Sequence, residues 1–165
     1  MLTQEHALEL FNYEPDSGLL VWKIAHGIHG RTPAGTVAGT RGQRGVLIVR
    51  VGGKNYLVHR VIWLIVKGAW PKKGIDHKDL DPGNNKWDNL RECTQSQNST
   101  NCRAKRQNKF GIKGAYWSER DKSWSSKITV KRQLINLGTF KTAEDAHAAY
   151  MRAALKYFGE FARAA

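Results

Sequence analysis

The chain has 165 residues, of which 41% are hydrophobic and 10% aromatic, and this indicates a folded protein with one ordinary core or two small ones. Lys and Arg outnumber Asp and Glu by 27 to 14, which gives a formal net charge of +13. A surplus this large favours nucleic acid over a neutral protein or an acidic small molecule as partner. A membrane partner is the weaker interpretation, because the longest apolar run, residues 61–66, is far too short to span a bilayer.

The basic surplus lies mostly toward the C-terminus, where residues 103–165 hold 14 Lys and Arg against 5 Asp and Glu. Four basic residues fall within residues 103–109, where the apolar pattern stops. They predict a basic linker between two domains, with the boundaries 1–102, 103–110 and 111–165. Within this linker, Arg103, Lys105 and Arg106 either follow DNA phosphates or form a solvated helix tail with no partner.

Two further patterns bear on the compartment of the protein. The first residues lack the basic and then apolar order of a secretory signal, so we expect the chain to stay in a cytosol. Cys93 and Cys102 are the only cysteines and do not form a Cys-x-x-Cys pair. Neither a disulfide framework nor a thiolate zinc site is therefore expected.

The first half of the chain predicts a helix followed by short strands. Thr3 can cap a helix in which Ala7, Leu8, Leu10 and Phe11 recur at helical spacing, and residues 15–18 then form a turn. Strands are predicted over residues 19–24, 46–51 and 55–58, with the tight turn Gly52-Gly53 between the last two, and a helix over 59–67 that ends at Gly68. The glycine- and arginine-rich segment 35–45 suits a surface loop or backbone close to DNA, and the loop is the simpler interpretation.

Polar residues gather after this helix. A short extended segment ends at Ile75, so Asp76 and His77 should lie where a strand runs into the polar loop 78–88, exposed to a substrate. A second strand is predicted over residues 90–93. Thr94 and Gln97 then form a capping-box pattern, which puts Asn98 in the first turns of a helix.

This strand, loop, strand and helix order can bring together the parts of a metal-dependent nuclease. Asp76 and Asn98 could offer a carboxylate and an amide oxygen to one hard cation such as Mg²⁺. The imidazole of His77 would stand ready to deprotonate water. The simpler alternative is that Asn and Asp in loops make ordinary Asx turns, and Asn84 and Asn85 are assigned to it.

Several stretches resemble the HNH endonuclease family in order and spacing, with the phage and intron-borne homing type and its ββα-metal core the most similar. They are residues 59–63, 75–79, 84–91 and 94–98, and residues 10–13 and 17–22 also resemble the leader of phage HNH proteins. If the chain is phage-encoded, its cytosol is that of the bacterial host.

The resemblance implies a role for each residue of the motif. Asp76 and Asn98 would bind Mg²⁺ or Mn²⁺, His77 would be the general base, and Asn89 would orient that imidazole or stiffen its loop. Asn98 stands where the family name implies a histidine. Because related homing enzymes also have asparagine at this position, the resemblance still implies activity, with a metal affinity that can differ. His59 lies outside this set and is interpreted as a structural residue.

The C-terminal third predicts three antiparallel strands and a helix. The strands cover residues 113–118, 123–130 and 133–137, and Thr142 can cap a helix that ends before Gly159. Residues 114–117, 124, 127–128, 137–140, 142–146 and 149–154 resemble the AP2/ERF DNA-binding domain. The resemblance implies that the sheet lies in the major groove of DNA.

Carried over by position, one set of side chains would face DNA. These are Lys113, Tyr116, Ser118, Lys127, Thr129 and Asn136, with Arg120 and Arg132 near the DNA backbone. Several of these positions differ from the plant members, so the plant target sequence is not inherited. Trp117 and Trp124 are interpreted as core residues.

The combined prediction is an α+β protein of two modules that cleaves double-stranded DNA. One metal ion would act with the His77 base, and no membrane or small-molecule cofactor is expected. A monomer is favoured. The alternatives are a DNA-binding regulator that keeps the nuclease fold as a scaffold, and an RNA-binding protein with exposed aromatic side chains.

Overall fold

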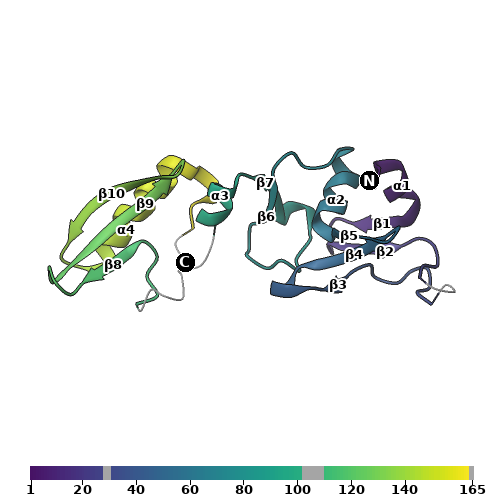
Figure 1. The fold of residues 1–165 in the computed structure, drawn as a ribbon, viewed down its shortest axis with the longest axis horizontal. Coiled ribbons are helices and arrows are strands. Elements are labelled where there is room, and N and C mark those ends of the chain that lie inside the picture. The colour runs from purple at the N-terminus through teal and green to yellow at the C-terminus, as the bar shows by residue number, and fades with distance from the viewer. Residues whose placement is uncertain (28–30, 102–109, 164–165) are drawn as a thin grey trace. The chain divides into compact units, whose positions relative to one another are not determined.

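The computed structural model describes residues 1–27, 31–101 and 110–163 (Figure 1). The chain divides into two compact units, Met1–Cys93 and Thr94–Ala165. Helices and small antiparallel sheets occur in both units, which confirms the α+β class. Of the predicted linker, residues 103–109 lie outside the described part, and with them Arg103, Lys105 and Arg106. The boundary at that linker therefore stays a prediction.

The first unit begins with a helix and a hairpin. These are α1 (Gln4–Leu10), β1 (Phe11–Glu14) and β2 (Leu19–Trp22), with Phe11 opposite Trp22 in the antiparallel register. Thr3 caps α1 as predicted, because its hydroxyl accepts a hydrogen bond from the His6 N–H at 3.3 Å. The prediction that Phe11 belongs to the helix is wrong. Phe11 starts β1, where pairing with β2 buries its ring to 1% exposure.

A three-stranded sheet and a helix follow in the first unit. They are β3 (Thr40–Arg41), β4 (Leu47–Val51), β5 (Lys54–Leu57) and α2 (Val58–Lys67), in the sheet order β3-β4-β5. The hairpin at Gly52-Gly53 and the helix after it are confirmed. Gly68 ends α2 with φ 77°, a left-handed conformation that glycine adopts without steric cost.

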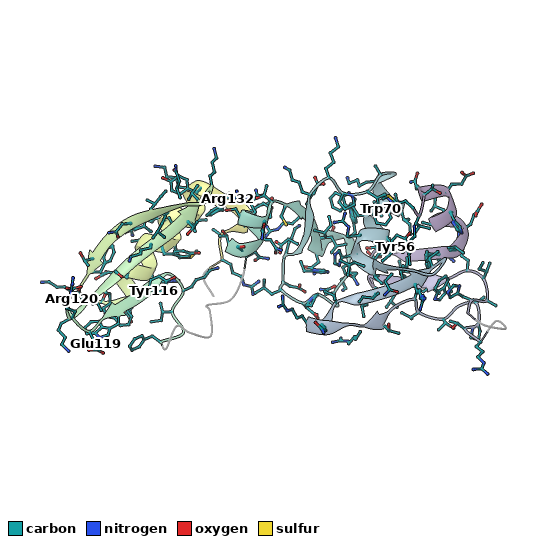
Figure 2. All side chains as sticks on the ribbon, in the orientation of Figure 1. Tyr56, Trp70, Tyr116, Glu119, Arg120 and Arg132 are labelled. Carbon is teal, nitrogen blue, oxygen red and sulfur yellow. The ribbon has the colours of Figure 1, made fainter. Side chains whose placement is uncertain are left out.

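The core of the first unit joins α1, α2 and the strands around them. Val61 and Ile62 of α2 are fully buried against side chains of the first hairpin, Phe11 and Leu20 among them. Burying each such side chain stabilises the fold by roughly 1.5–3 kcal/mol. At the edge of this core, Tyr56 stacks on Trp70 with ring centroids 5.7 Å apart (Figure 2). Residues 1–22 are therefore part of the same folded body as α2.

The first unit ends with a two-stranded ribbon, and a short helix opens the second unit. The ribbon consists of β6 (Gly74–His77) and β7 (Leu90–Cys93), with a single 3₁₀ turn, η3 (Trp87–Asn89), before β7. The helix is α3 (Gln95–Thr100). Thr94 and Gln97 form both hydrogen bonds of the predicted capping box, so the strand, loop, strand and helix order is confirmed.

The remainder of the second unit is a three-stranded sheet with one long helix. The elements are β8 (Ala115–Ser118), β9 (Ser123–Val130), β10 (Gln133–Phe140), α4 (Ala143–Phe158) and η4 (Gly159–Phe161), with the sheet order β10-β9-β8. Helix α4 lies along one face of the sheet (Figure 1). Ala146 and Ala154 are fully buried, and such small side chains let a helix approach a sheet closely. The predicted strands and helix are confirmed, with two differences in their bounds. β8 begins at Ala115 because residues 113 and 114 form a turn, and β10 runs three residues further, past a bulge between Asn136 and Gly138.

None of the helices within the described ranges is long and apolar enough to cross a membrane.

Candidate active site

Asp76 and His77 are the last two residues of strand β6. The register places Asp76 opposite Arg91 and His77 opposite Leu90. Their side chains are 3% and 8% exposed, so the prediction that both are open to solvent is wrong. The physical reason is that both side chains meet partners inside the fold. His77 lies against the Asn85 amide of the loop after β6, and Asp76 pairs with Arg91 of β7.

Asp76 forms an ion pair with the strand opposite. Its Oδ2 accepts a hydrogen bond from Arg91 Nε at 2.9 Å, and the Arg91 side chain is only 11% exposed. A charge-assisted hydrogen bond in such a site is short and directional. It fixes the carboxylate at the end of the ribbon through one of its two oxygens.

The imidazole of His77 is held by two side chains from elsewhere in the first unit. Its Nε2 lies 3.0 Å from Oδ1 of Asn85, which is 1% exposed. The ring of His59, from α2, meets it edge to face with the centroids 5.1 Å apart. Sequence reasoning missed Asn85, because its place between Asn84 and Lys86 in a polar loop looks the same as that of an exposed asparagine.

His59 is buried at 6% exposure, and its Nδ1 has no hydrogen-bond partner among the described residues. Burial lowers the pKa of His59 to about 4, with smaller contributions from His77 and Arg60. The ring is therefore neutral near pH 7 and packs as an uncharged group. This environment agrees with the structural role predicted for it.

Asn89 braces the loop rather than the imidazole. Its Oδ1 accepts a hydrogen bond from the Asp79 N–H at 3.0 Å. Its amide nitrogen donates to Asp79 Oδ1 at 2.9 Å and to the carbonyl oxygen of Asn84 at 2.7 Å. The resemblance implies that Asn89 either orients the His77 imidazole or stiffens the loop. These three hydrogen bonds fit the second role.

Asp79 is the centre of the same hydrogen-bond network. Burial acts to raise the pKa of its carboxyl group, but hydrogen bonds from the Asp81 backbone and from the Asn84 and Asn89 side chains outweigh it. With a further contribution from His77, the pKa of Asp79 is held below its usual value. The ionised carboxylate thus keeps the loop after His77 closed at neutral pH.

The first hairpin, β1 and β2, also forms hydrogen bonds with the loop after His77. The Tyr13 hydroxyl donates to the carbonyl oxygen of Asn85 at 2.9 Å, and the Trp87 N–H donates to that of Pro15 at 3.3 Å. Burial, helped by the nearby carboxylates of Asp88 and Asp16, raises the pKa of Tyr13 to about 12, which keeps the hydroxyl a donor.

Gly18 sits in the turn of this hairpin at φ +76°. A Cβ there would lie 2.5 Å from the Lys86 backbone nitrogen and 2.7 Å from the Asn85 carbonyl carbon. Only glycine allows the turn to approach the loop this closely. The backbone of the Asn85–Trp87 segment is thus fixed by residues about seventy positions earlier in the chain.

Asn98, the second predicted metal ligand, lies in α3 with its side chain exposed. It belongs to the second unit and Asp76 to the first, so their joint binding of a metal stays a prediction. Within the described ranges, no three His, Cys, Asp or Glu side chains gather to hold a metal. One carboxylate and one amide oxygen do suit a hard cation such as Mg²⁺, which takes few protein ligands.

The second unit presents the sheet face opposite α4. Ala115, Ser126 and Ile128 are buried beneath the helix, so their neighbours along each strand point the other way. The outward side chains include Tyr116, Ser118, Lys127, Thr129 and Asn136, all predicted to face DNA, and Asn136 lies opposite Lys127 in the register. Figure 2 shows Arg120 and Arg132 at opposite ends of the sheet. We call these seven residues the outer sheet face.

Lys113 does not lie on the outer sheet face, and the prediction for it is wrong. It is 7% exposed, and its ammonium group donates to the carbonyl oxygens of Thr100 and Arg163. Buried ammonium groups require such partners. Trp117 and Trp124 are half-buried and pack against each other, with centroids 5.4 Å apart.

Comparison with known proteins bears on the family of this chain. Protein 3.8 of Escherichia phage T7 is 32% identical to it over 106 residues, which is 64% of this chain and 87% of that protein. Residues 56–100, which include β6, β7 and their loop, match the family of HNH endonucleases. The chain belongs to the HNH endonuclease family. No solved structure gives a match.

Membership of the HNH endonuclease family supports a nuclease and implies DNA binding. The HNH part of the predicted resemblance is therefore confirmed. The homing type, the AP2/ERF likeness of the second unit, the metal and the roles of single residues stay predictions.

Proposed function

We propose that this HNH endonuclease is a divalent-metal-dependent enzyme that hydrolyses phosphodiester bonds of double-stranded DNA, directed by its second unit. The observation that carries the proposal is the buried His77 imidazole, hydrogen-bonded by Asn85 and next in sequence to Asp76, inside the matched region. The basic surplus of the chain supports a polyanionic substrate. The phage relative supports a phage origin, so that the enzyme would act in the host cytoplasm, as a monomer.

His77 would accept a proton from the water that attacks the phosphorus, and general-base catalysis of this kind typically contributes 10²–10⁴-fold. Asn89 would keep the loop after His77 closed. Asp76 and Asn98 would hold one Mg²⁺ or Mn²⁺, which supplies a Lewis acid for the charge that develops on the phosphate and the leaving 3′ oxygen. The products would carry 5′-phosphate and 3′-hydroxyl ends.

The outer sheet face would supply the second contact with DNA. Lys127 would contact a phosphate, and Tyr116, Thr129 and Asn136 offer groups that can contact base edges. Phosphate contacts alone bind DNA without selecting a sequence, so a second unit with outward polar and aromatic side chains is needed for a directed enzyme.

The test is conversion of supercoiled plasmid with Mg²⁺ or with EDTA, by the wild type and by His77→Ala. His6→Ala is the matched control, because His6 is exposed on α1, away from the ribbon. In Mg²⁺ we expect conversion by the wild type and the control, and conversion slower by about 10²–10⁴-fold by His77→Ala. In EDTA we expect none. Equal conversion by His77→Ala would exclude His77 as the base.

A second candidate function is a DNA-binding regulator that keeps the nuclease fold as a scaffold. It is favoured by one observation, which is that Asp76 is 3% exposed and already paired with Arg91. In that case the folded protein would retard a DNA fragment containing its own site in a gel, yet leave it uncut in Mg²⁺ or Mn²⁺.

A further inference from the structure

The side chain of Asn85 occupies an unusual place for a loop asparagine. It is 1% exposed, among the largest side chains that the described residues bury completely. Buried amide groups in proteins almost always have hydrogen-bond partners. The partners here are His77 Nε2, 3.0 Å from Asn85 Oδ1, and the Gly83 carbonyl oxygen, which accepts from the amide nitrogen at 3.5 Å.

This arrangement favours one of the two neutral tautomers of the His77 imidazole. The amide nitrogen faces Gly83, so the atom that faces His77 is a carbonyl oxygen, and such an oxygen can only accept. An accepting oxygen at this distance favours the tautomer with hydrogen on Nε2. Because neutral imidazole has one N–H, the lone pair is then on Nδ1.

We propose that Asn85 is a positioning residue, which holds His77 as the Nε2–H tautomer so that Nδ1 is the atom that takes the proton from water. The part concerning water rests on the proposed nuclease function, whereas the tautomer does not. An acceptor behind a working histidine fixes both its tautomer and its ring direction, and losing such a partner typically costs 10–100-fold in activity. The orienting role thus falls to Asn85 and not to Asn89.

The first hairpin holds the backbone of Asn85 in place. The carbonyl oxygen of Asn85 accepts from the Tyr13 hydroxyl, and the Gly18 turn presses against the backbone of Asn85 and Lys86. The amide of Asn85 therefore has a rigid backbone, as a positioning group requires. The His59 ring adds an edge-to-face contact on the imidazole, so His77 is confined by two groups from different elements.

The experiment uses the full chain with ¹⁵N-labelled histidine, and reads the ring nitrogens of His77 by NMR at a pH where the ring is neutral. In the wild type we expect a protonated Nε2, an unprotonated Nδ1, and an Nε2–H proton that is protected from exchange with water. A protonated Nδ1 in the wild type would overturn the proposal without any variant being made.

Two substitutions of similar volume extend the test. Asn85→Leu removes the acceptor, and we expect a mixture of tautomers, loss of the protected Nε2–H signal and a fall in kcat of about 10–100-fold with KM nearly unchanged. Asn85→Asp keeps an acceptor, and the Nε2–H tautomer should return. Asn55→Leu, at an exposed asparagine of β5, is the control and should match the wild type.

The outcomes separate this proposal from the proposed function. Wild-type ring signals in a folded Asn85→Leu variant would overturn the positioning role, whatever the enzyme cleaves. If His77→Ala cleaves like the wild type, the nuclease mechanism fails, while the NMR result still decides the tautomer.

Discussion

The ribbon of β6 and β7 and the outer sheet face differ in how they present polar groups. On the ribbon and in the loop between its strands, Asp76, His77 and Asn85 are buried, and each is held by a partner from another segment. On the sheet, Lys127 and Asn136 are exposed and lie opposite each other on β9 and β10. Geometry that is fixed in advance suits chemistry, whereas exposed side chains can adapt to a groove. Substitutions on the ribbon should change rate or stability, and those on the sheet should change affinity.

The largest expected effect is on the rate. His77→Ala should lower the rate of DNA cleavage by about 10²–10⁴-fold, because the general base is lost. Affinity for DNA, measured by gel retardation in Ca²⁺ or EDTA, should stay within a factor of a few. A comparable loss of affinity would mean that His77 binds DNA rather than acting in the reaction.

Among the substitutions that lower stability, we expect the largest effect from removing Arg91, the partner of Asp76. Arg91→Leu removes the guanidinium group that pairs with the buried Asp76 carboxylate, and breaking a buried pair typically costs about 3–5 kcal/mol in the free energy of unfolding. Urea denaturation measures it. Arg120→Leu is the matched control, since its pair with Asp121 is exposed and such pairs contribute little. Equal loss in both variants would contradict a special role for the buried pair.

Acid should destabilise the first unit through His59. Below pH 6.5 the unfolded chain takes up a proton at this residue, whereas the folded chain does so only near its lowered pKa of about 4. The free energy of unfolding therefore falls between pH 6.5 and pH 4, by about 3 kcal/mol for the full shift. His59→Gln should flatten this part of the curve of stability against pH. His6→Gln controls for the loss of a histidine, and an unchanged slope in His59→Gln would refute the assignment.

The clamp of the first hairpin can be tested at two glycines with nearly the same backbone angle. Gly18→Ala combines a positive φ with a Cβ against the backbone of Lys86, and it should cost about 1–3 kcal/mol and lower kcat by loosening Asn85. Gly53→Ala, at φ +77° with open space around it, should cost about 1 kcal/mol and leave kcat unchanged. Equal kcat values in the two variants would separate the hairpin from catalysis.

The smallest effect is expected on the outer sheet face. Lys127→Ala should weaken DNA binding similarly for all sequences, and lower the slope of log affinity against log salt by about 1. Lys156→Ala makes the same charge change on helix α4 and should leave the slope as it is. Fluorescence anisotropy over a series of salt concentrations measures both. A stronger effect of Lys156→Ala would place DNA on the helix side of the second unit.

Much of the fold could be predicted because local signals agreed with the tertiary structure. Three short sequence patterns each predict one local conformation. They are the Gly52-Gly53 turn, the helix end at Gly68 and the capping box that begins at Thr94. Strand β1 was missed because Phe11 and the residues before it continue a helical spacing. Only pairing with β2, a contact between segments, makes it a strand.

The sequence predicted where the candidate site lies in the chain, but it did not predict which side chains hydrogen-bond there. Asp76 and His77 could be located from the pattern of a strand that ends in a polar loop. Asn85 could not be separated from Asn84, because its burial is imposed by Tyr13 and Gly18, far away in sequence. Lys113 was misplaced for a similar reason. Strand alternation does not reveal that the carbonyl oxygens of Thr100 and Arg163 accept hydrogen bonds from its ammonium group.

The contact between the first hairpin and the loop has a practical consequence for anyone trimming this protein. A fragment cut to residues 56–100, the span that defines the family, would lose Tyr13 and Gly18, and would leave Val61 and Ile62 without their cover. The smallest autonomous nuclease piece must therefore start near the beginning of the chain. Grafting the motif into another scaffold would require transplanting this distant support as well.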